Sequence, residues 1–551
     1  MVRTKEGKSM NIKGKMREKS GITLITLVVT IIILLILAGI TIATITSDNG
    51  IIKNANDAKE QTEIAEEKEI VDRATIQAMG NNKRGNLVKD ELQEELDKIT
   101  GKGKTETSEI GEEIEVVFVE SDRYYTVDID GNVIQIITEE NVADTPTYWE
   151  KTTKTDKEWY SYADISNGDK EVKVNEPKLR GAMTAIKYVG EDKESQTGSK
   201  WANAITQDGS MWVWIPRYAY KITSGYHESG TDTTGGTIEV AFIDTNNQFL
   251  NGETGTIVTD PKEVTYTNNV QNEWLVHPAF TSNAENGGGF GELTGIWVGK
   301  FETTGTYDST TGTRIVTILP GTRNDLGSMT INEMYQLAKS TTFGEKVTIN
   351  NHMAKNSEWG AIAYLAQSKY GVNGQKINVS GSSSATGGSS DKKIIYMTNK
   401  TQSTTNNAYG VYDMRGGLWE HVASYVNSTS IASVNQDIGG YGEEGSLLGR
   451  NEAEKAKSTS YKTVYEAESN QINSYNLTES RKGDAIWETS VYGKTAWFNG
   501  EIAYPSGDSG FFSRGGCYQN NPGIFTYYYF GGYNKKGPRG QGATFRTILA
   551  F

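Results

Sequence analysis

The C-terminal stretch "SRGGCYQNNPGIFTYYYFGGYNKKGPRGQGATFRTILAF", residues 513–551, places seven aromatic residues between positions 518 and 533, among glycines and asparagines. A core strand would alternate apolar and polar residues, and a flexible tail would contain few aromatic residues. Because successive side chains of a strand point to opposite faces, the run 527–530 cannot face one core throughout. The stretch therefore predicts solvent-facing aromatic side chains, while several of the seven remain candidates for ordinary core.

Composition limits the class of protein. With 551 residues the chain is too long for one ordinary core, so two or three domains are expected. The net charge of −14 argues against a nucleic-acid partner, whose phosphates would be repelled. Sixty glycines and few long helical patterns after residue 100 favour turn-rich β structure. A single cysteine, Cys517, excludes an intrachain disulfide and a multi-cysteine metal site.

The N-terminus has the pattern of a membrane anchor. After a basic leader over residues 1–21, the segment "GITLITLVVTIIILLILAGITIATI" (Gly21–Ile45) carries no charge. As a helix it would be roughly 36 Å long at about 1.5 Å per residue, enough to cross a hydrocarbon core. The alternative, a cleaved secretory signal, would have a shorter apolar core. We expect a single-pass cell-membrane protein with its transmembrane helix over 22–46, a cytoplasmic N-terminus and an extracellular bulk.

The junction "KSG/ITLITL" resembles the signature of prepilins. The resemblance implies that a prepilin peptidase cuts between Gly21 and Ile22, and that the apolar helix serves as an anchor or packs with other pilins in a pilus. Pilins that polymerise usually carry Glu at the fifth mature position, where this chain has Thr26. Since an unpaired carboxylate is costly in a membrane, Thr26 favours a solitary anchor. Association with a pilus stays open.

The chain after the anchor divides by pattern into a stem, a linker and a head. We expect a pilin-like stem over 47–138, a polar linker over 139–168 and a ligand-binding domain over 169–551 whose variable segment is 513–551. The expected stem elements are a solvated helix over Ile51–Met79, a shorter helix over Leu87–Ile99 and a three-strand meander over Glu113–Ile136. In the head, the pattern predicts short helices at Ile331–Ser340 and Ser357–Lys369 and a polar insertion over Ser424–Lys482.

Five motifs in the head occur in an order typical of one family. They are "MWVWIPRYAYKI" (Met211–Ile222), "GIWVGKFETT" (Gly295–Thr304), "NHMAKNSEWGAIAYLAQSKYG" (Asn351–Gly371), "YGVYDMRGGLWEHV" (Tyr409–Val422) and "SRGGCY…ATFR". Together they resemble the formylglycine-generating-enzyme (sulfatase-modifying factor) domain, a variant of the C-type-lectin fold. With the prepilin-like start, the expected fold class is α+β: a transmembrane, pilin-like helix with a small antiparallel sheet, then a C-type-lectin-like head rich in short strands and loops.

The same motifs also predict structural roles that need no chemistry. Large buried area is expected from the tryptophans at positions 212, 214, 297, 359 and 419. Arg514 and Arg546 are expected to pair with buried carbonyls or carboxylates, with Glu420 as one candidate.

The enzymatic chemistry of the resembled family is not expected here. Its oxidase binds copper through a cysteine pair in the segment after "GGS", whereas Cys517 has no partner cysteine. Copper(I) requires soft thiolate ligands, so the chain is predicted not to be an enzyme of this type. An iron centre is not expected either, because the histidines 277, 352 and 421 lie in separate motifs. No cofactor is predicted, apart from the option of a structural calcium near Gly416–Glu420 that the resemblance implies.

The C-terminal segment is similar to that of variable proteins of diversity-generating retroelements, which share this fold. In that family adenine positions of the gene are rewritten, so a template AAY codon can become any NNY codon. The resemblance implies that "SRGG" and "ATFR" are a fixed frame and that the aromatics, with Tyr527 and Tyr529 outward, form a binding surface like that of antibody loops. The NNY-compatible, and therefore candidate ligand-binding, residues are Cys517, Tyr518, Asn520, Asn521, Ile524, Phe525, Tyr527, Tyr529, Phe530, Tyr533 and Asn534.

The function expected from these patterns is a cell-surface receptor or adhesin with a hypervariable surface that binds an extracellular protein or glycan. The alternative is a type IV pilin-like adhesin or minor pilin without diversification. A formylglycine-generating-type oxidase has the least support.

Overall fold

The computed structural model describes residues 51–81, 87–110, 113–121, 123–128, 131–136, 146–228, 230–321, 326, 329, 331–344, 350–381, 385–388, 395–427, 457–466, 481–491, 496–504, 511–519, 522–530 and 543–551. The chain forms two compact units, of which the second contains all residues from Gln135 onward. The expected anchor over 22–46 and the junction Gly21/Ile22 lie outside the described residues. None of the helices within the described ranges has the length and apolar character needed to cross a membrane.

The first unit is built around two helices. α2 (Ile51–Asn81) buries Val71, Ala74 and Ala78, which share one helical face, and α3 (Lys89–Thr100) buries Leu92 and Leu96. In the sequence, the two helices are followed by a four-stranded sheet. The two predicted helices and the meander are confirmed, and the sheet has one additional strand. In sheet order its strands are β1 (Thr105–Ile110), β2 (Glu113–Phe118), β3 (Arg123–Val127) and β4 (Val133–Ile136).

The second unit contains a seven-stranded sheet. Its order is β20 (Asn351–Met353), β27 (Thr547–Leu549), β17 (Gly295–Gly299), β10 (Met211–Pro216), β9 (Asn203–Ile205), β8 (Thr184–Tyr188) and β5 (Trp149–Lys151). Every residue of β10 and β17 is buried, and their antiparallel register sets Trp214 opposite Trp297. Burial on both faces explains why these strands read as continuous apolar runs rather than alternating ones.

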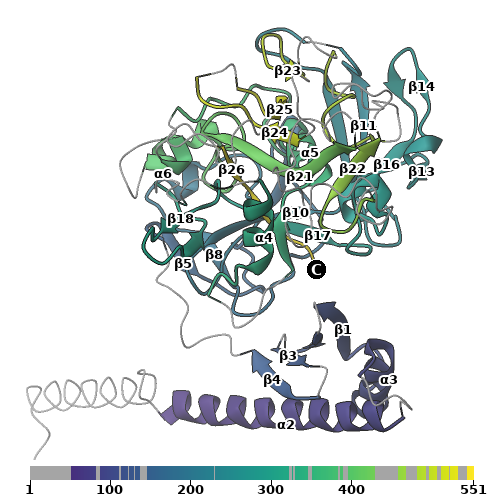
Figure 1. Ribbon diagram of the computed structural model, residues 1–551, viewed down its shortest axis with the longest axis vertical. Helices are drawn as coiled ribbons and strands as arrows, with labels where there is room; N and C mark the ends of the chain where they lie inside the picture. Colours follow the sequence, from purple (N-terminus) through teal and green to yellow (C-terminus); the bar gives the residue numbers. More distant parts are fainter. Residues whose placement is uncertain are drawn as a thin grey trace, which may run out of the picture. The chain divides into compact units, whose positions relative to one another are not determined.

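A six-stranded sheet carries the C-terminal segment (Figure 1). Its order is β22 (Thr463–Glu466), β21 (Trp419–Asn427), β24 (Phe511–Arg514), β25 (Tyr527–Phe530) and β23 (Ala503–Tyr504), and β26 (Ala543–Phe545) also pairs with β21. The long strand β21 runs across the unit in Figure 1 and pairs with β24 and β26, which lie far from it in the sequence.

Smaller sheets complete the second unit. A four-stranded sheet has the order β12 (Thr237–Phe242), β11 (Tyr218–Ser224), β16 (Trp274–Val276) and β13 (Ile257–Val258). Three strand pairs are β6 (Tyr162–Asp164) with β7 (Lys170–Val172), β14 (Tyr266–Thr267) with β15 (Val270–Gln271), and β18 (Thr304–Tyr307) with β19 (Arg314–Thr317).

The described part of the second unit contains the α-helices α4 (Ile331–Ser340), α5 (Asn356–Gln367) and α6 (Ile395–Thr398). The two short helices predicted from sequence are confirmed as α4 and α5. Every residue of α5 is buried. Its first turn is closed by Glu358, whose carboxylate accepts a hydrogen bond from the backbone N–H of Lys355 at 2.8 Å. The helix therefore serves as a packing element inside a β structure.

The expected α+β fold class with a C-type-lectin-like head is wrong. The structure consists mostly of strands in several, mainly antiparallel sheets, and 21% of it is helical. The predicted helices do form, but in the second unit they are short and separate, so they make no helical layer. The expected linker over 139–168 also needs correction from Trp149 onward. Trp149 and Tyr162 are buried in β5 and β6, which pair with β8 and β7 of the second unit.

Candidate functional site

The turn after β24 shapes the C-terminal segment. Gly515 and Gly516 have φ angles of 77° and 74°, in the left-handed region that favours glycine. A Cβ on Gly516 would lie 2.8 Å from the Cα of Pro522, too close for any side chain. The chain then returns so that β25 pairs with β24 in antiparallel register, with Tyr527 opposite Arg514. The "GG" of the motif is therefore needed to make this turn.

The tip of this turn reaches solvent. Cys517 and Tyr518 are partly exposed, and Gln519 is exposed. The amide Nε2 of Gln519 donates a hydrogen bond to the Tyr518 hydroxyl at 2.6 Å. The backbone N–H of Tyr518 donates to the carbonyl of Gly417 at 3.2 Å, so the backbone of the tip is held while its side chains face outward.

Three candidate binding residues face the interior instead. Ile524, Phe525 and Tyr527 are exposed by only 1%, 0% and 0%. The phenyl ring of Phe525 lies 5.5 Å from the ring of Trp497, and the Tyr527 hydroxyl lies 3.2 Å from Ser490 Oγ. The expectation that Phe525 and Tyr527 face solvent is wrong, because the chain after the turn enters an aromatic core.

The other candidates are placed only in part. The backbones of Tyr529 and Phe530 belong to β25, opposite Phe512 and Phe511 of β24. Asn520, Asn521, Tyr533 and Asn534 lie outside the described residues.

Arg514 fixes the start of the segment through buried hydrogen bonds. It is fully buried, and its guanidinium donates to Asn356 Oδ1 at 3.1 Å and to the carbonyls of Asp484 and Ala485 at 2.9 and 2.8 Å. The indole of Trp359, in the same helix as Asn356, donates to the carbonyl of Ile524 at 2.7 Å. Both ends of the turn are thus tied to α5, and the structural role expected for Arg514 is confirmed.

Glu501 lies directly beneath the returning chain. It is 2% exposed, and among the described residues neither carboxylate oxygen has a hydrogen-bond donor. Lys376 Nζ and Arg415 Nε lie 3.5 and 3.6 Å from Oε1, at ion-pair rather than hydrogen-bond distance. A Cβ on Gly523 would lie 1.9 Å from Oε2, so the backbone of Gly523 rests against this carboxylate.

Burial controls the ionisation of Glu501. It raises the pKa of the carboxyl to about 7, against the opposing attraction of Lys376 and Arg415. No local pattern in "FNGEIAY" marks Glu501 as buried, because its partners Lys376 and Arg415 are distant in sequence. A surface loop is therefore supported by a carboxylate that titrates near neutral pH.

A second buried carboxylate cluster lies where a calcium ion was considered. Both oxygens of Glu420 accept from Arg546, at 3.0 and 2.5 Å, which confirms the expected pairing. Glu302 Oε1 accepts from the N–H of Leu418 at 2.7 Å, and Asp413 accepts from Ser380 and Gly387.

These oxygens accept hydrogen bonds from donors within the protein. The option of a structural calcium near Gly416–Glu420 stays a prediction. In the described ranges, no group of three or more His, Cys, Asp or Glu side chains has a metal-holding arrangement. Burial raises the pKa of Glu302, and the neighbouring charges of Asp413 and Glu420 raise it further.

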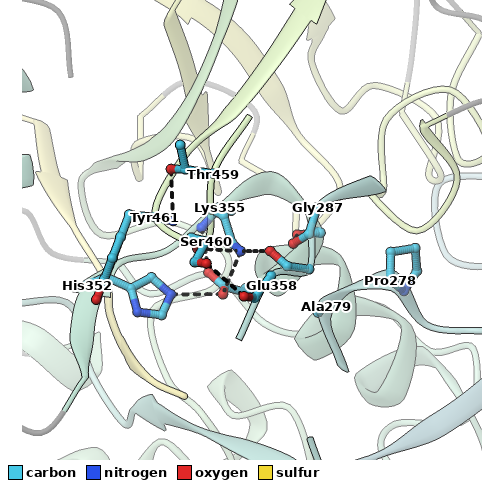
Figure 2. A network of polar contacts seen from close by, with 12 residues as sticks. Pro278, Ala279, Gly287, His352, Lys355, Glu358, Thr459, Ser460 and Tyr461 are labelled. Atoms are coloured by element: carbon cyan, nitrogen blue, oxygen red, sulfur yellow. Dashed lines mark hydrogen bonds and ion pairs between the residues drawn. The ribbon is translucent and has the colours of Figure 1, made fainter. Parts of the chain in front are cut away.

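The "NHMAKNSEWG" motif forms a closed polar network (Figure 2). His352 Nε2 lies 2.8 Å from Glu358 Oε1, and Lys355 Nζ donates to the carbonyls of Gly288 and Ser460, both at 2.7 Å. Burial acts to raise the pKa of Glu358, but the neighbouring His352 and Lys355 lower it below its ordinary value. All three side chains are almost completely buried, so this network stabilises the fold and offers no access to a substrate.

The remaining motif residues also have structural roles. The tryptophans at positions 212, 214, 297 and 359 are fully buried and Trp419 is 8% exposed, as expected. His277 is enclosed by aromatic rings including those of Tyr218 and Tyr220, and His421 Nδ1 lies 2.9 Å from Ser513 Oγ. His352 contacts Glu358, so each of the three histidines has different neighbours.

No protein-family model matches the chain, and no curated protein matches it.

Proposed function

We propose that the protein is a ligand-binding protein of the cell surface whose binding surface is the C-terminal segment 513–551, diversified by a retroelement and anchored through residues 22–46. The main support for the proposal is a difference in solvent exposure between the two sides of one short turn. Cys517, Tyr518 and Gln519 reach solvent, while Arg514 and Trp359 beneath them are fully buried.

This contrast is what a variable surface requires. A side chain that reaches solvent can usually be replaced at a cost within about 0.5 kcal/mol. Its backbone must nevertheless be held, so that each new side chain is presented in an ordered position. The hydrogen bonds of Tyr518 to Gly417 and of Trp359 to Ile524 hold the backbone on both sides of the tip.

The structure narrows the set of positions that can vary freely. Cys517 and Tyr518 are NNY-compatible and solvent-facing, so they form the described part of the proposed binding surface. Ile524, Phe525 and Tyr527 are NNY-compatible but buried, so only residues of similar size and polarity fit there. Asn520, Asn521, Tyr529, Phe530, Tyr533 and Asn534 stay in the proposal on codon compatibility alone.

The test needs no knowledge of the ligand. The DNA flanking the gene is sequenced and searched for a near-copy of the codons for residues 513–551, together with a reverse-transcriptase gene. The proposal expects differences only where the copy has adenine, and identical codons for the buried Arg514 and Arg546. A complete genome without such a copy would overturn diversification and leave the pilin-like adhesin as the explanation.

A further inference from the structure

A cavity of about 180 Å³ opens at the β5–β8 end of the seven-stranded sheet, a different sheet from the one that carries the C-terminal segment. Its lining includes three tyrosines, at positions 160, 188 and 409, with four lysines and two glutamates. Drug-sized ligands occupy pockets of about 300–1,000 Å³, so this cavity suits a smaller polar molecule.

The tyrosines form a rigid floor. The rings of Tyr188 and Tyr409 lie 6.1 Å apart and nearly perpendicular, and both residues are almost fully buried. The Tyr188 hydroxyl donates to Asp192 Oδ1 at 2.6 Å. Tyr160, which is partly exposed, lines the same cavity. Burial raises the pKa of Tyr160 and Tyr409 to about 12, so their phenols stay neutral at physiological pH.

The lysines of the cavity differ in their pairing. Lys187 Nζ has three carboxylates within reach, those of Asp156, Glu150 and Glu158, at 2.9, 3.4 and 3.4 Å. The Lys200 ammonium lies 5.9 Å from the ring centre of Tyr409 and forms no ion pair with any residue that the structure describes. Lys200 is partly buried and lines the cavity, where the carboxylates of Glu158 and Glu194 also lie, but it is not paired directly with either of them.

We propose that this cavity binds an acidic sugar unit, a monosaccharide that carries one carboxylate. The ammonium of Lys200 would pair with that carboxylate, since charge-assisted hydrogen bonds are the strongest available to it. Glu158 and the tyrosine floor supply the acceptors and the apolar surface that a ring of hydroxyls and C–H groups needs.

The site does not depend on the proposed diversification. Its lining comes from β8, from residues within 157–161 and 193–200 and from Tyr409, all far in sequence from residues 513–551. A protein with both surfaces would have one fixed specificity and one variable specificity, which bivalent attachment can combine into higher avidity.

The experiment compares D-glucuronate with D-glucose, two sugars that differ only at C6, and includes inorganic phosphate as a general anion. Binding to the full chain is measured by isothermal titration calorimetry and by ligand-observed NMR. The proposal expects glucuronate to bind, with glucose and phosphate at least about tenfold weaker. Lys200→Met should reduce glucuronate binding about tenfold or more, and Lys200→Arg should retain most of it.

The matched control is Lys262→Met, which removes a lysine charge from an exposed position outside the cavity. It should leave binding unchanged. The Lys200 side chain can be changed without touching its backbone hydrogen bonds to Ser161, at 2.9 and 2.7 Å, so folding is expected to survive. Equal binding of phosphate, no binding of glucuronate, or an unaffected Lys200→Met variant would each overturn the proposal.

Discussion

At the scale of single residues, Glu501 is a buried carboxylate that has no hydrogen-bond donor among the described residues. Its carboxyl has an ordinary pKa near 4.5 and a folded-state pKa of about 7. A raised carboxyl pKa means that folding favours the protonated form. Its contribution to stability is therefore present below pH 4.5 and is lost as the pH rises through about 7.

Glu501→Gln keeps the shape of the side chain and removes the titration. At pH 8 the free energy of unfolding should rise by about 3 kcal/mol, from roughly 1.4 kcal/mol for each unit of pKa shift, and at pH 5 it should change little. Chemical denaturation at both pH values measures this difference. Glu239→Gln, at an exposed position of β12, is the control and should have no effect at either pH. An equal gain at both pH values would mean that Glu501 does not titrate in this range.

The two sides of the C-terminal turn should respond differently to truncation. Tyr527→Ala removes a buried ring and its contact with Ser490, so we expect a loss of about 3–5 kcal/mol. Tyr518→Ala removes a partly exposed ring and should change the free energy of unfolding by no more than about 0.5 kcal/mol. Thermal unfolding of both variants checks this. Similar melting temperatures for the two would show that Tyr527 is not a core residue.

At the scale of elements, the backbone of Gly483 packs very close to α5. Gly360 lies in the middle of the helix, and a Cβ there would lie 1.8 Å from the backbone carbonyl oxygen of Gly483. The intrinsic preference for alanine in a helix, about 1 kcal/mol over glycine, is therefore opposed by a backbone clash. The carbonyls of the next two residues, Asp484 and Ala485, accept the hydrogen bonds of Arg514, so α5 and the C-terminal segment contact the same stretch of chain.

Two helical glycines provide a matched test. Gly360→Ala should destabilise the second unit by about 1–3 kcal/mol because of overpacking. Gly80→Ala, near the end of α2 with no atom within 4 Å of the new Cβ, should instead stabilise its helix by up to about 1 kcal/mol. Hydrogen exchange of the amides in each helix reports both effects separately. Stabilisation by Gly360→Ala would contradict the close approach of residues 483 and 360.

At the scale of the whole molecule, the proposed surface location can be examined through processing of the N-terminus. If the junction Gly21/Ile22 is cut by a prepilin peptidase, Gly21→Leu should leave the leader attached and raise the mass of the protein by that of residues 1–21. Intact-mass spectrometry and N-terminal sequencing measure the change. Gly14→Leu, inside the leader, is the control and should be processed normally. An unchanged mature N-terminus in the Gly21→Leu variant would rule out the prepilin-like junction.

The sequence alone determined the positions of individual elements well. α4 was predicted with its observed bounds, α2 and α5 within a few residues, and the burial of Trp214, Trp297 and Arg514 followed from residue type. These features depend on local periodicity and on the size or charge of a side chain, which are properties that a single sequence contains.

The balance of strands and helices and the orientation of the C-terminal aromatics depend on tertiary contacts. The excess of strands over helices comes from pairings between distant segments, such as β21 with β24 and β26, that no local pattern encodes. Tyr527 was expected outside but lies inside, where its ring is fully buried and its hydroxyl lies 3.2 Å from Ser490 Oγ. Alternation along a strand predicts that the strand has two faces. Which face meets the core depends on the distant segments that pack against it.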